Sequence, residues 1–114
     1  MKNLEPLHDL ESLEAAIAES GDRPVLLFKH SRYCGVSCEA LDELQSHIDG
    51  RTGGTAAYKV ITVQTHRPIS DAVAQRLGIR HETPQAILLR DGKPVWSASH
   101  FRITADQLDQ ILPE

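Results

Sequence analysis

An apolar run that ends in a polar turn and a cysteine limits most strongly how this chain can fold. The run Val25–Lys29 follows Arg23-Pro24 and has the length of a buried strand. Residues 30–33 are polar or semipolar, and Cys34 stands where apolar residues begin to recur with helical spacing. The pattern predicts a strand, a turn and a helix, with the cysteine at the N-terminus of that helix.

This position favours a reactive thiol over an inert one. Unpaired N–H groups and the positive end of the helix dipole stabilise a thiolate, which is the attacking species in thiol exchange. Lys29, His30 and Arg32 precede Cys34 and are expected to add positive potential. Free cysteines are often buried, but Cys34 follows polar residues and does not lie within an apolar run.

The rest of the chain alternates between helical and strand patterns. Asp91-Gly92 is a strong signal for a tight hairpin between the last two strands. Strands joined by a crossover helix are expected to be parallel, and the hairpin antiparallel. The predicted strands cover 25–29, 57–63, 86–89 and 94–98; the predicted helices cover 9–19 (with Leu10, Leu13, Ala16 and Ile17 on its apolar face), 34–48, 69–77 and a final segment capped by Thr104.

Thr83-Pro84 directly precedes the strand at 86–89. A cysteine at a strand-to-helix junction, with an X-Pro before a later strand, is the outline of thioredoxin-like folds. We therefore predict one thioredoxin-like α/β domain over residues 1–114, with a mixed four-stranded sheet flanked by helices: two parallel strands plus a C-terminal antiparallel hairpin. In this fold the proline bond is cis, and Thr83 exposes its backbone to an incoming chain opposite Cys34.

Cys38 follows Cys34 at C-x-x-x-C spacing. In a regular helix the two Cα atoms would lie about 6.2 Å apart, but the Cβ atoms, at about 5–6 Å, exceed the roughly 3.5–4.5 Å of a disulfide. A bridge therefore requires Cys34 to leave helical geometry or the first turn to loosen, which Gly35 makes easier. A resolving thiol and an inert buried thiol are both open interpretations of Cys38.

Composition excludes several classes of partner. The net charge is -4 and the pI is near 5.8, so we expect no binding to nucleic acid or to an anionic membrane. The first residues have no apolar signal segment, and a cytoplasmic protein is expected. Two cysteines in a reducing compartment point to catalysis, metal binding or burial. The acidic side chains of Glu39, Asp42 and Glu43 are expected to form a solvated helix face.

A metal site is the alternative function. Thiolate and imidazole suit copper or zinc, and some copper-delivery proteins of thioredoxin-like fold combine C-x-x-x-C with a distant histidine. Cys34 and Cys38 with His81 or His100 could supply such a set. For each histidine, a solvated or hydrogen-bonded side chain is the simpler reading. A thioredoxin-fold interaction module would instead have a Cys34 of ordinary reactivity.

Several short blocks of sequence occur together in one known family. They are Lys29-His30-Ser31, Cys34, Ser37, Thr83-Pro84-Gln85, Asp91-Gly92-Lys93, Val95-Trp96 and Ser99-His100. Over nearly its whole length, the chain resembles the YtxJ family, monothiol bacilliredoxin-type proteins of the bacillithiol redox system. The resemblance implies reduction of mixed disulfides on S-thiolated client proteins, with bacillithiol or a related small thiol as co-substrate and without a bound cofactor.

The resemblance assigns the nucleophile to Cys34 and the cis-proline to Pro84. Gly35 stands where the family pattern often has proline, and Cys38 where a small non-thiol residue is usual. Cys38 would thus permit internal release of the mixed disulfide. The complete predicted site has the catalytic thiols Cys34 and Cys38, the substrate-binding residues Lys29, His30, Arg32, Thr83 and Pro84, and no metal.

Overall fold

A mixed sheet forms the centre of the protein in the computed structural model, which describes residues 3–51 and 54–112. Within these residues the strands run in the order β1-β3-β2-β4-β5. β3 pairs in parallel with β1 and β2, whereas β4 is antiparallel to β2 and to β5. The bounds are Glu5–Pro6 for β1, Val25–His30 for β2, Ala57–Thr62 for β3, Gln85–Arg90 for β4 and Lys93–Ser99 for β5.

The prediction of four strands misses β1 at the edge of the sheet. This strand has only two residues, both exposed, so it has no alternating pattern to detect. Proline is tolerated there because an edge strand has one unpaired side. Leu4 and Leu7 on either side are buried, and the Leu7 N–H donates to the Val60 carbonyl at 2.9 Å.

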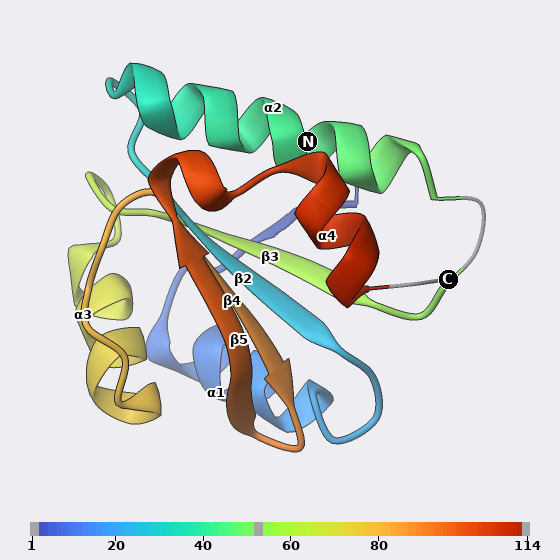
Figure 1. Cartoon of the computed structure of the whole chain (residues 1–114). Coiled ribbons are helices and arrows are strands. Elements are labelled where there is room, and N and C mark those ends of the chain that lie inside the picture. The colour runs from blue at the N-terminus through green and yellow to red at the C-terminus, as the bar shows by residue number, and fades with distance from the viewer. Residues whose placement is uncertain (1–2, 52–53, 113–114) are drawn as a thin grey trace.

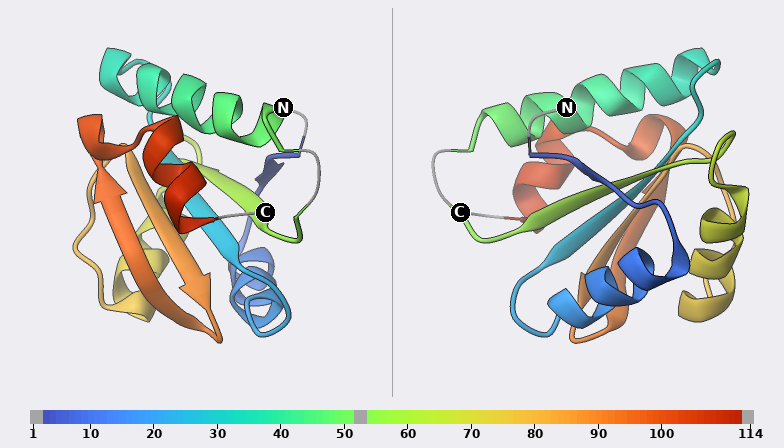
Figure 2. Two further views of the ribbon diagram at one scale, coloured as in Figure 1. Left: turned by 45° about the vertical axis from the view of Figure 1, so that its right-hand side comes forward. Right: turned by 180° about the vertical axis from the view of Figure 1, so that it is seen from behind.

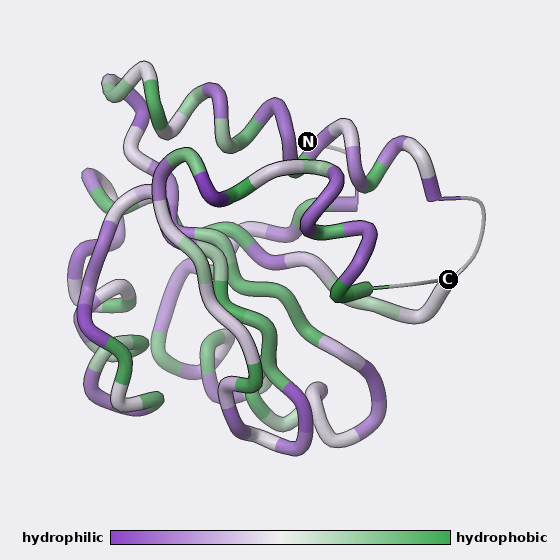
Figure 3. Tube along the Cα trace, in the orientation of Figure 1, coloured by the Kyte–Doolittle hydropathy of each residue, from purple (hydrophilic) through white to green (hydrophobic). Residues whose placement is uncertain are grey.

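Helices cover both faces of the sheet (Figures 1 and 2). α2 (Gly35–Asp49) and α4 (Ala105–Ile111) pack on one face, and α1 (Leu10–Glu19) and α3 (Arg67–Leu77) on the other. The central strands are mainly apolar (Figure 3), and every residue of β2 is buried, as expected for a strand that is covered by helices on both faces. Alternate residues of β2 therefore enter two separate cores, such as Phe28 beneath α2 and Leu27 beneath α1.

The ends of the helices follow the expected chemistry. Thr104 caps α4 by accepting a hydrogen bond from the Gln107 N–H, and Gly78 ends α3 at a φ of 67°. In α1 the predicted apolar face is wrong at one position, since Leu10 is 56% exposed. Leu10 is the first residue of the helix, and spacing alone does not show where the packed layer ends.

The turn between β4 and β5 is held by the end of α1. Asp91 and Gly92 both have positive φ, at 52° and 75°, as the predicted hairpin requires. The Asp91 N–H donates to the Ser20 carbonyl at 2.8 Å, and the Gly92 N–H to the Ser20 hydroxyl at 2.7 Å. These two bonds fix the hairpin to the adjacent helix.

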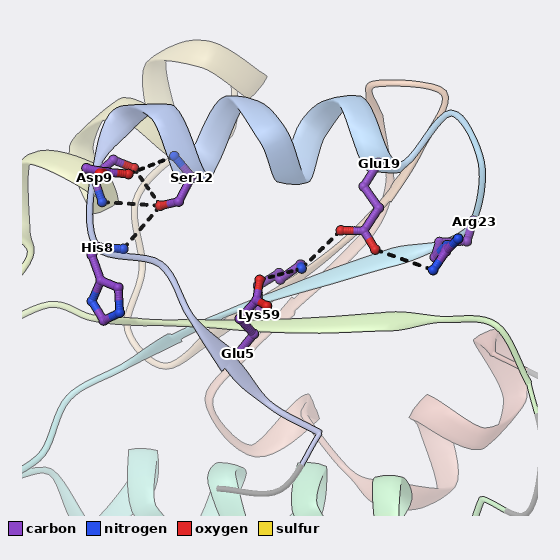
Figure 4. Close-up of polar contacts among 7 residues, drawn as sticks. All are labelled: Glu5, His8, Asp9, Ser12, Glu19, Arg23 and Lys59. Atoms are coloured by element: carbon purple, nitrogen blue, oxygen red, sulfur yellow. Dashed lines mark hydrogen bonds and ion pairs between the residues drawn. The ribbon is translucent and has the colours of Figure 1, made fainter.

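A buried lysine joins the edge of the sheet to α1 (Figure 4). Lys59 Nζ lies 2.7 Å from Glu5 Oε1 and 3.0 Å from Glu19 Oε1. Burial by itself lowers the pKa of Lys59, but the two carboxylates outweigh it and the pKa is raised.

No helix in the described ranges is long and apolar enough to cross a membrane.

Candidate active site

Cys34 lies between the central strand β2 and helix α2. It is the N-cap residue of α2, with φ -105° and ψ 120°, so the helix begins at Gly35. The Cys34 carbonyl accepts the first helical bond, from the Cys38 N–H at 3.0 Å. The side chain is half-buried and makes no capping hydrogen bond. The thiol therefore sits where helix N–H groups and the dipole favour an anion.

Cys38 is exposed, which contradicts its interpretation as an inert buried thiol. The buried face of α2 consists of Ser37, Ala40 and Leu44, followed by His47 and Ile48, and Cys38 lies outside this face. The Cys38 thiol donates to the Arg32 carbonyl at 3.7 Å. Both thiols are free, and Cys34 has the non-helical geometry that a bridge to Cys38 would require.

Two side chains that sequence reasoning did not assign to the site hold the loop before Cys34. The Ser37 hydroxyl accepts the Ser31 N–H at 2.9 Å, and Gln64 accepts the Arg32 N–H at 3.1 Å. The Gln64 amide nitrogen also donates to the Ser31 hydroxyl at 2.6 Å. Ser37 appears in the sequence only as one letter of a family pattern, and Gln64 lies in a distant segment without any pattern.

His30 is buried beneath this loop and does not reach the surface expected of a substrate-binding residue. Its Nδ1 lies 2.8 Å from the Ser37 hydroxyl. A hydroxyl can accept and donate at the same time, so Ser37 can bridge the Ser31 N–H and the His30 ring. Burial, and then the Arg32 charge, lower the pKa of His30. Arg32 itself is exposed.

Lys29 is also placed differently from the prediction. Its side chain is 1% exposed, and Nζ lies 3.1 Å from His81 Nδ1. Strand alternation directs Lys29 to the face opposite His30, which is the α3 side. Burial lowers the pKa of Lys29 to about 8, with Asp71 opposing and Arg67 reinforcing the effect. Lys29 therefore does not offer a surface charge for a small anionic thiol.

The loop before β4 lies beside the Cys34 loop. The Thr83–Pro84 bond is cis, and Gln85, the next residue, pairs with Lys29 at the end of β2. The start of α2, this loop and the turn after β5 gather at one end of the sheet (Figure 1). Within this end, the His100 N–H donates to the Pro84 carbonyl at 3.1 Å, with His100 at a φ of 55°.

Two aromatic side chains are exposed at the start of α2 and in the turn after β5. Tyr33, directly before Cys34, is 88% exposed, and Phe101 is 71% exposed. A hollow of about 450 Å³ between α2 and the turn after β5 is lined by Val36, His100 and Phe101, among others. A larger hollow of about 780 Å³ lies at the opposite end of the sheet, near the start of β3. Neither thiol lines either hollow.

The prediction of a solvated acidic face on α2 is correct for two of its three residues. Glu39 and Asp42 are exposed, but Glu43 is half-buried. Its carboxylate accepts the Ala105 N–H at 2.8 Å. Glu43 therefore belongs to the N-terminal cap of α4.

The metal-binding alternative has no converging ligands. Among the described residues, no group of three or more His, Cys, Asp and Glu side chains could hold a metal ion. His81, one of the histidines considered, is hydrogen-bonded to Lys29 and Thr83. The structure thus gives no support to a copper site built on Cys34 and Cys38.

Known proteins resemble this chain in sequence and in fold. A family described as Monothiol bacilliredoxin BrxC matches residues 5–108. A solved structure described as a candidate oxidoreductase with a thioredoxin fold is 29% identical, with 94% of this chain and 91% of that chain covered and a TM-score of 0.84. A mutant thioredoxin from Halobacterium salinarum (18% identical, 96% and 87% covered, TM-score 0.72) and the thioredoxin of Fasciola hepatica (17%, 94% and 94%, 0.71) share the fold.

Proposed function

The chain belongs to the monothiol bacilliredoxin family, and on that premise we propose that it reduces mixed disulfides between cytoplasmic client proteins and a small thiol of the bacillithiol type. The predicted thioredoxin-like fold is confirmed by the solved structure of similar fold. The observation that carries the proposal is the half-buried Cys34 thiol at the N-cap of α2, beside the cis-proline loop.

The first step is an exchange at the small thiol. The Cys34 thiolate attacks the sulfur of the small thiol, a bond forms between these two sulfurs, and the client sulfur leaves with the electron pair and takes up a proton. The products are a free client thiol and a mixed disulfide on Cys34. The N-terminus of α2 favours the anionic form of Cys34, and the exposed Tyr33 and Phe101 offer apolar contact area to a client.

The second step removes the small thiol from Cys34. A second molecule of the small thiol attacks as the thiolate and leaves as the symmetric disulfide, which regenerates Cys34. Alternatively, the Cys38 thiolate attacks Cys34 Sγ, releases the small thiol and forms an internal disulfide that a further dithiol reductant must open. The exposure of Cys38 and the extended geometry of Cys34 support the second route.

Intact mass separates these routes. Reduced protein is mixed with a bacillithiolated peptide, and the wild type is compared with the variants Cys34→Ser and Cys38→Ala. We expect no turnover in Cys34→Ser, because the nucleophile is lost; full turnover in this variant would refute the proposal. A transient adduct in the wild type followed by a loss of two hydrogens, with a stable adduct in Cys38→Ala, identifies Cys38 as the resolving thiol. A stable adduct in both proteins identifies the monothiol route.

A further inference from the structure

A chain of hydrogen bonds runs from the buried Lys29 to the residue before the cis-proline. Lys29 Nζ lies 3.1 Å from His81 Nδ1, and His81 Nε2 lies 3.2 Å from the Thr83 hydroxyl. The Ser70 hydroxyl lies 3.3 Å from the same Nδ1. Among the described residues, the side chain of Lys29 is hydrogen-bonded to His81 and forms no ion pair with a carboxylate.

The donor and acceptor roles along this chain follow from Lys29. An ammonium can only donate, so His81 Nδ1 must accept and the proton of the neutral ring lies on Nε2. The Nε2–H then donates to the oxygen of Thr83. The hydroxyl proton of Thr83 is consequently free to be donated to an acceptor other than these side chains. Thr83 is half-buried, so its hydroxyl can meet a ligand at the cis-proline loop.

We propose that Lys29 is a positioning residue that acts through His81 to keep the Thr83 hydroxyl a hydrogen-bond donor toward a client segment docked at the cis-proline loop. This inference rests on the proposed function, since it names how the client is held while Cys34 reacts. The acceptor of the Thr83 hydroxyl would be a backbone carbonyl oxygen of an extended client segment. Strand addition beside Thr83 brings such a carbonyl group to this loop.

The protonation of Lys29 makes this arrangement dependent on pH. Its pKa is about 8, and the pKa of His81 is lowered by burial and then by Lys29 and Arg67. Arg67 and Asp71 of α3 and Glu82 beside His81 are the other charged groups that act on the pair. Above pH 8, the neutral amine offers a lone pair, so His81 can donate from Nδ1 and accept from Thr83 at Nε2. The Thr83 hydroxyl then donates its proton to His81 and no longer donates to a client.

The experiment compares the wild type with Thr83→Val. The second-order rate constant for reaction with a mixed-disulfide peptide is measured from pH 6.5 to 9.5, and the ratio of wild type to variant is taken at each pH. Each rate constant is divided by the thiolate fraction of Cys34, which is measured for each protein from the pH dependence of its alkylation, so that the ionisation of the thiol does not enter the ratio. One hydrogen bond predicts a ratio of about threefold to tenfold at pH 7, decreasing toward one above pH 9. A ratio that does not change with pH would overturn the proposal.

Three further variants make the test specific. In a Lys29→Met background, Thr83→Val should change the rate by less than twofold at every pH, whereas a Lys93→Met background should keep the pH-dependent ratio. Thr83→Ser retains the hydroxyl and should follow the wild type, which rules out a general effect of altering the loop. If Thr83→Val lowers the rate constant in the Lys29→Met background as much as it does in the wild type, a role for Lys29 is refuted.

Nitrogen NMR of His81 gives a readout independent of catalysis. In the wild type at pH 7, the ring should carry its proton on Nε2, and in Lys29→Met the two neutral tautomers should mix. An unchanged tautomer in Lys29→Met would refute the relay. Failure of the proposed function is seen separately, as full turnover in Cys34→Ser.

Discussion

Ser37 fixes the loop that presents Cys34. Its side chain has no solvent exposure, and its hydroxyl connects the Ser31 amide to the His30 ring. A hydroxyl is one of the few groups that can accept and donate at the same buried point. The geometry of the reactive cysteine therefore depends on a residue three positions later, inside the helix.

Ser37→Ala should destabilise the protein and alter the thiol. The substitution leaves the Ser31 N–H and His30 Nδ1 without a partner, and we expect the free energy of unfolding to fall by about 1–3 kcal/mol. The rate of alkylation of Cys34 should change as the loop loosens. Urea denaturation and iodoacetamide kinetics measure the two effects. Ser46→Ala, at an exposed position of the same helix, should change neither; equal effects at both positions would contradict this role.

Lys29→Met should stabilise the protein at neutral pH. The pKa of Lys29 is about 8 in the folded protein against an ordinary 10.5, so the unfolded chain binds more protons between these values. This lysine destabilises the fold most below pH 8, and the effect disappears as pH rises to 10.5. We expect Lys29→Met to raise the free energy of unfolding at pH 7 by up to about 3 kcal/mol, with no gain near pH 10.5.

Lys59→Met is the matched control, because it is the same substitution at the other buried lysine. Lys59 has two carboxylate partners. Its removal takes the nearest cation from both, and Glu19 keeps only the longer contact to Arg23 at 3.7 Å. We expect this variant to lose about 1–2 kcal/mol at pH 7. A loss of stability in Lys29→Met as well would show that the His81 contact outweighs the burial of the charge.

At the scale of elements, α4 depends on α2. α4 has only seven residues, and helices this short are not stable in isolation. Thr104 satisfies the Gln107 N–H from within the segment, and Glu43 of α2 satisfies the Ala105 N–H. One of the two caps therefore comes from a helix some sixty residues earlier, so sequence analysis identifies Thr104 but assigns Glu43 to a solvated face.

Glu43→Ala should lower the free energy of unfolding by about 1 kcal/mol, because an N-terminal amide of α4 loses its partner and the positive end of its dipole loses a nearby carboxylate. Chemical denaturation measures the change. Glu39→Ala removes the same charge from an exposed position one turn earlier in α2 and should stay within about 0.5 kcal/mol of the wild type. Equal losses would mean that the charge of α2, and not the cap, is responsible.

At the scale of the whole molecule, His47 joins three elements. Its Nδ1 lies 2.6 Å from Asp109 of α4, and its Nε2 lies 2.8 Å from the hydroxyl of Tyr58 in β3. The imidazole is closed to solvent. Burial lowers the pKa of His47, although the Asp109 carboxylate opposes it. One side chain of α2 thus links the sheet to the last helix.

Acid should weaken this junction. Because the folded pKa of His47 lies below its ordinary 6.5, the unfolded chain binds more protons as pH falls below 6.5, and stability decreases. The pKa values of His30 and His81 are also lowered, so the effects add. We expect His47→Gln to reduce the slope of unfolding free energy against pH between 5 and 6.5, measured by urea denaturation. His8→Gln, at an exposed position, should leave the slope as in the wild type; an unchanged slope in His47→Gln would contradict the assignment.

Features that depend on neighbouring residues are predictable from the amino-acid sequence alone. Helical spacing, the Asp91-Gly92 turn and the cap at Thr104 are local patterns, and they predict the order of the main strands and helices. The same holds for Cys34 at the start of α2, since a strand, a turn and a helix follow one another directly within residues 25–49. The outline of Cys34 with Thr83-Pro84 before a later strand predicted the thioredoxin-like fold, and the family blocks added the small-thiol chemistry.

The directions of the side chains in the site follow from contacts between segments that are distant in the sequence. A central strand is apolar on both faces, so its pattern does not show that Lys29 faces His81, a partner 52 residues away. The packing of α2 on the sheet decided that Cys38 is exposed and Ser37 is buried. Packing of distant segments likewise placed Gln64 at the loop and gave the two-residue β1 its partner. These contacts depend on how layers meet in space, which no local spacing encodes.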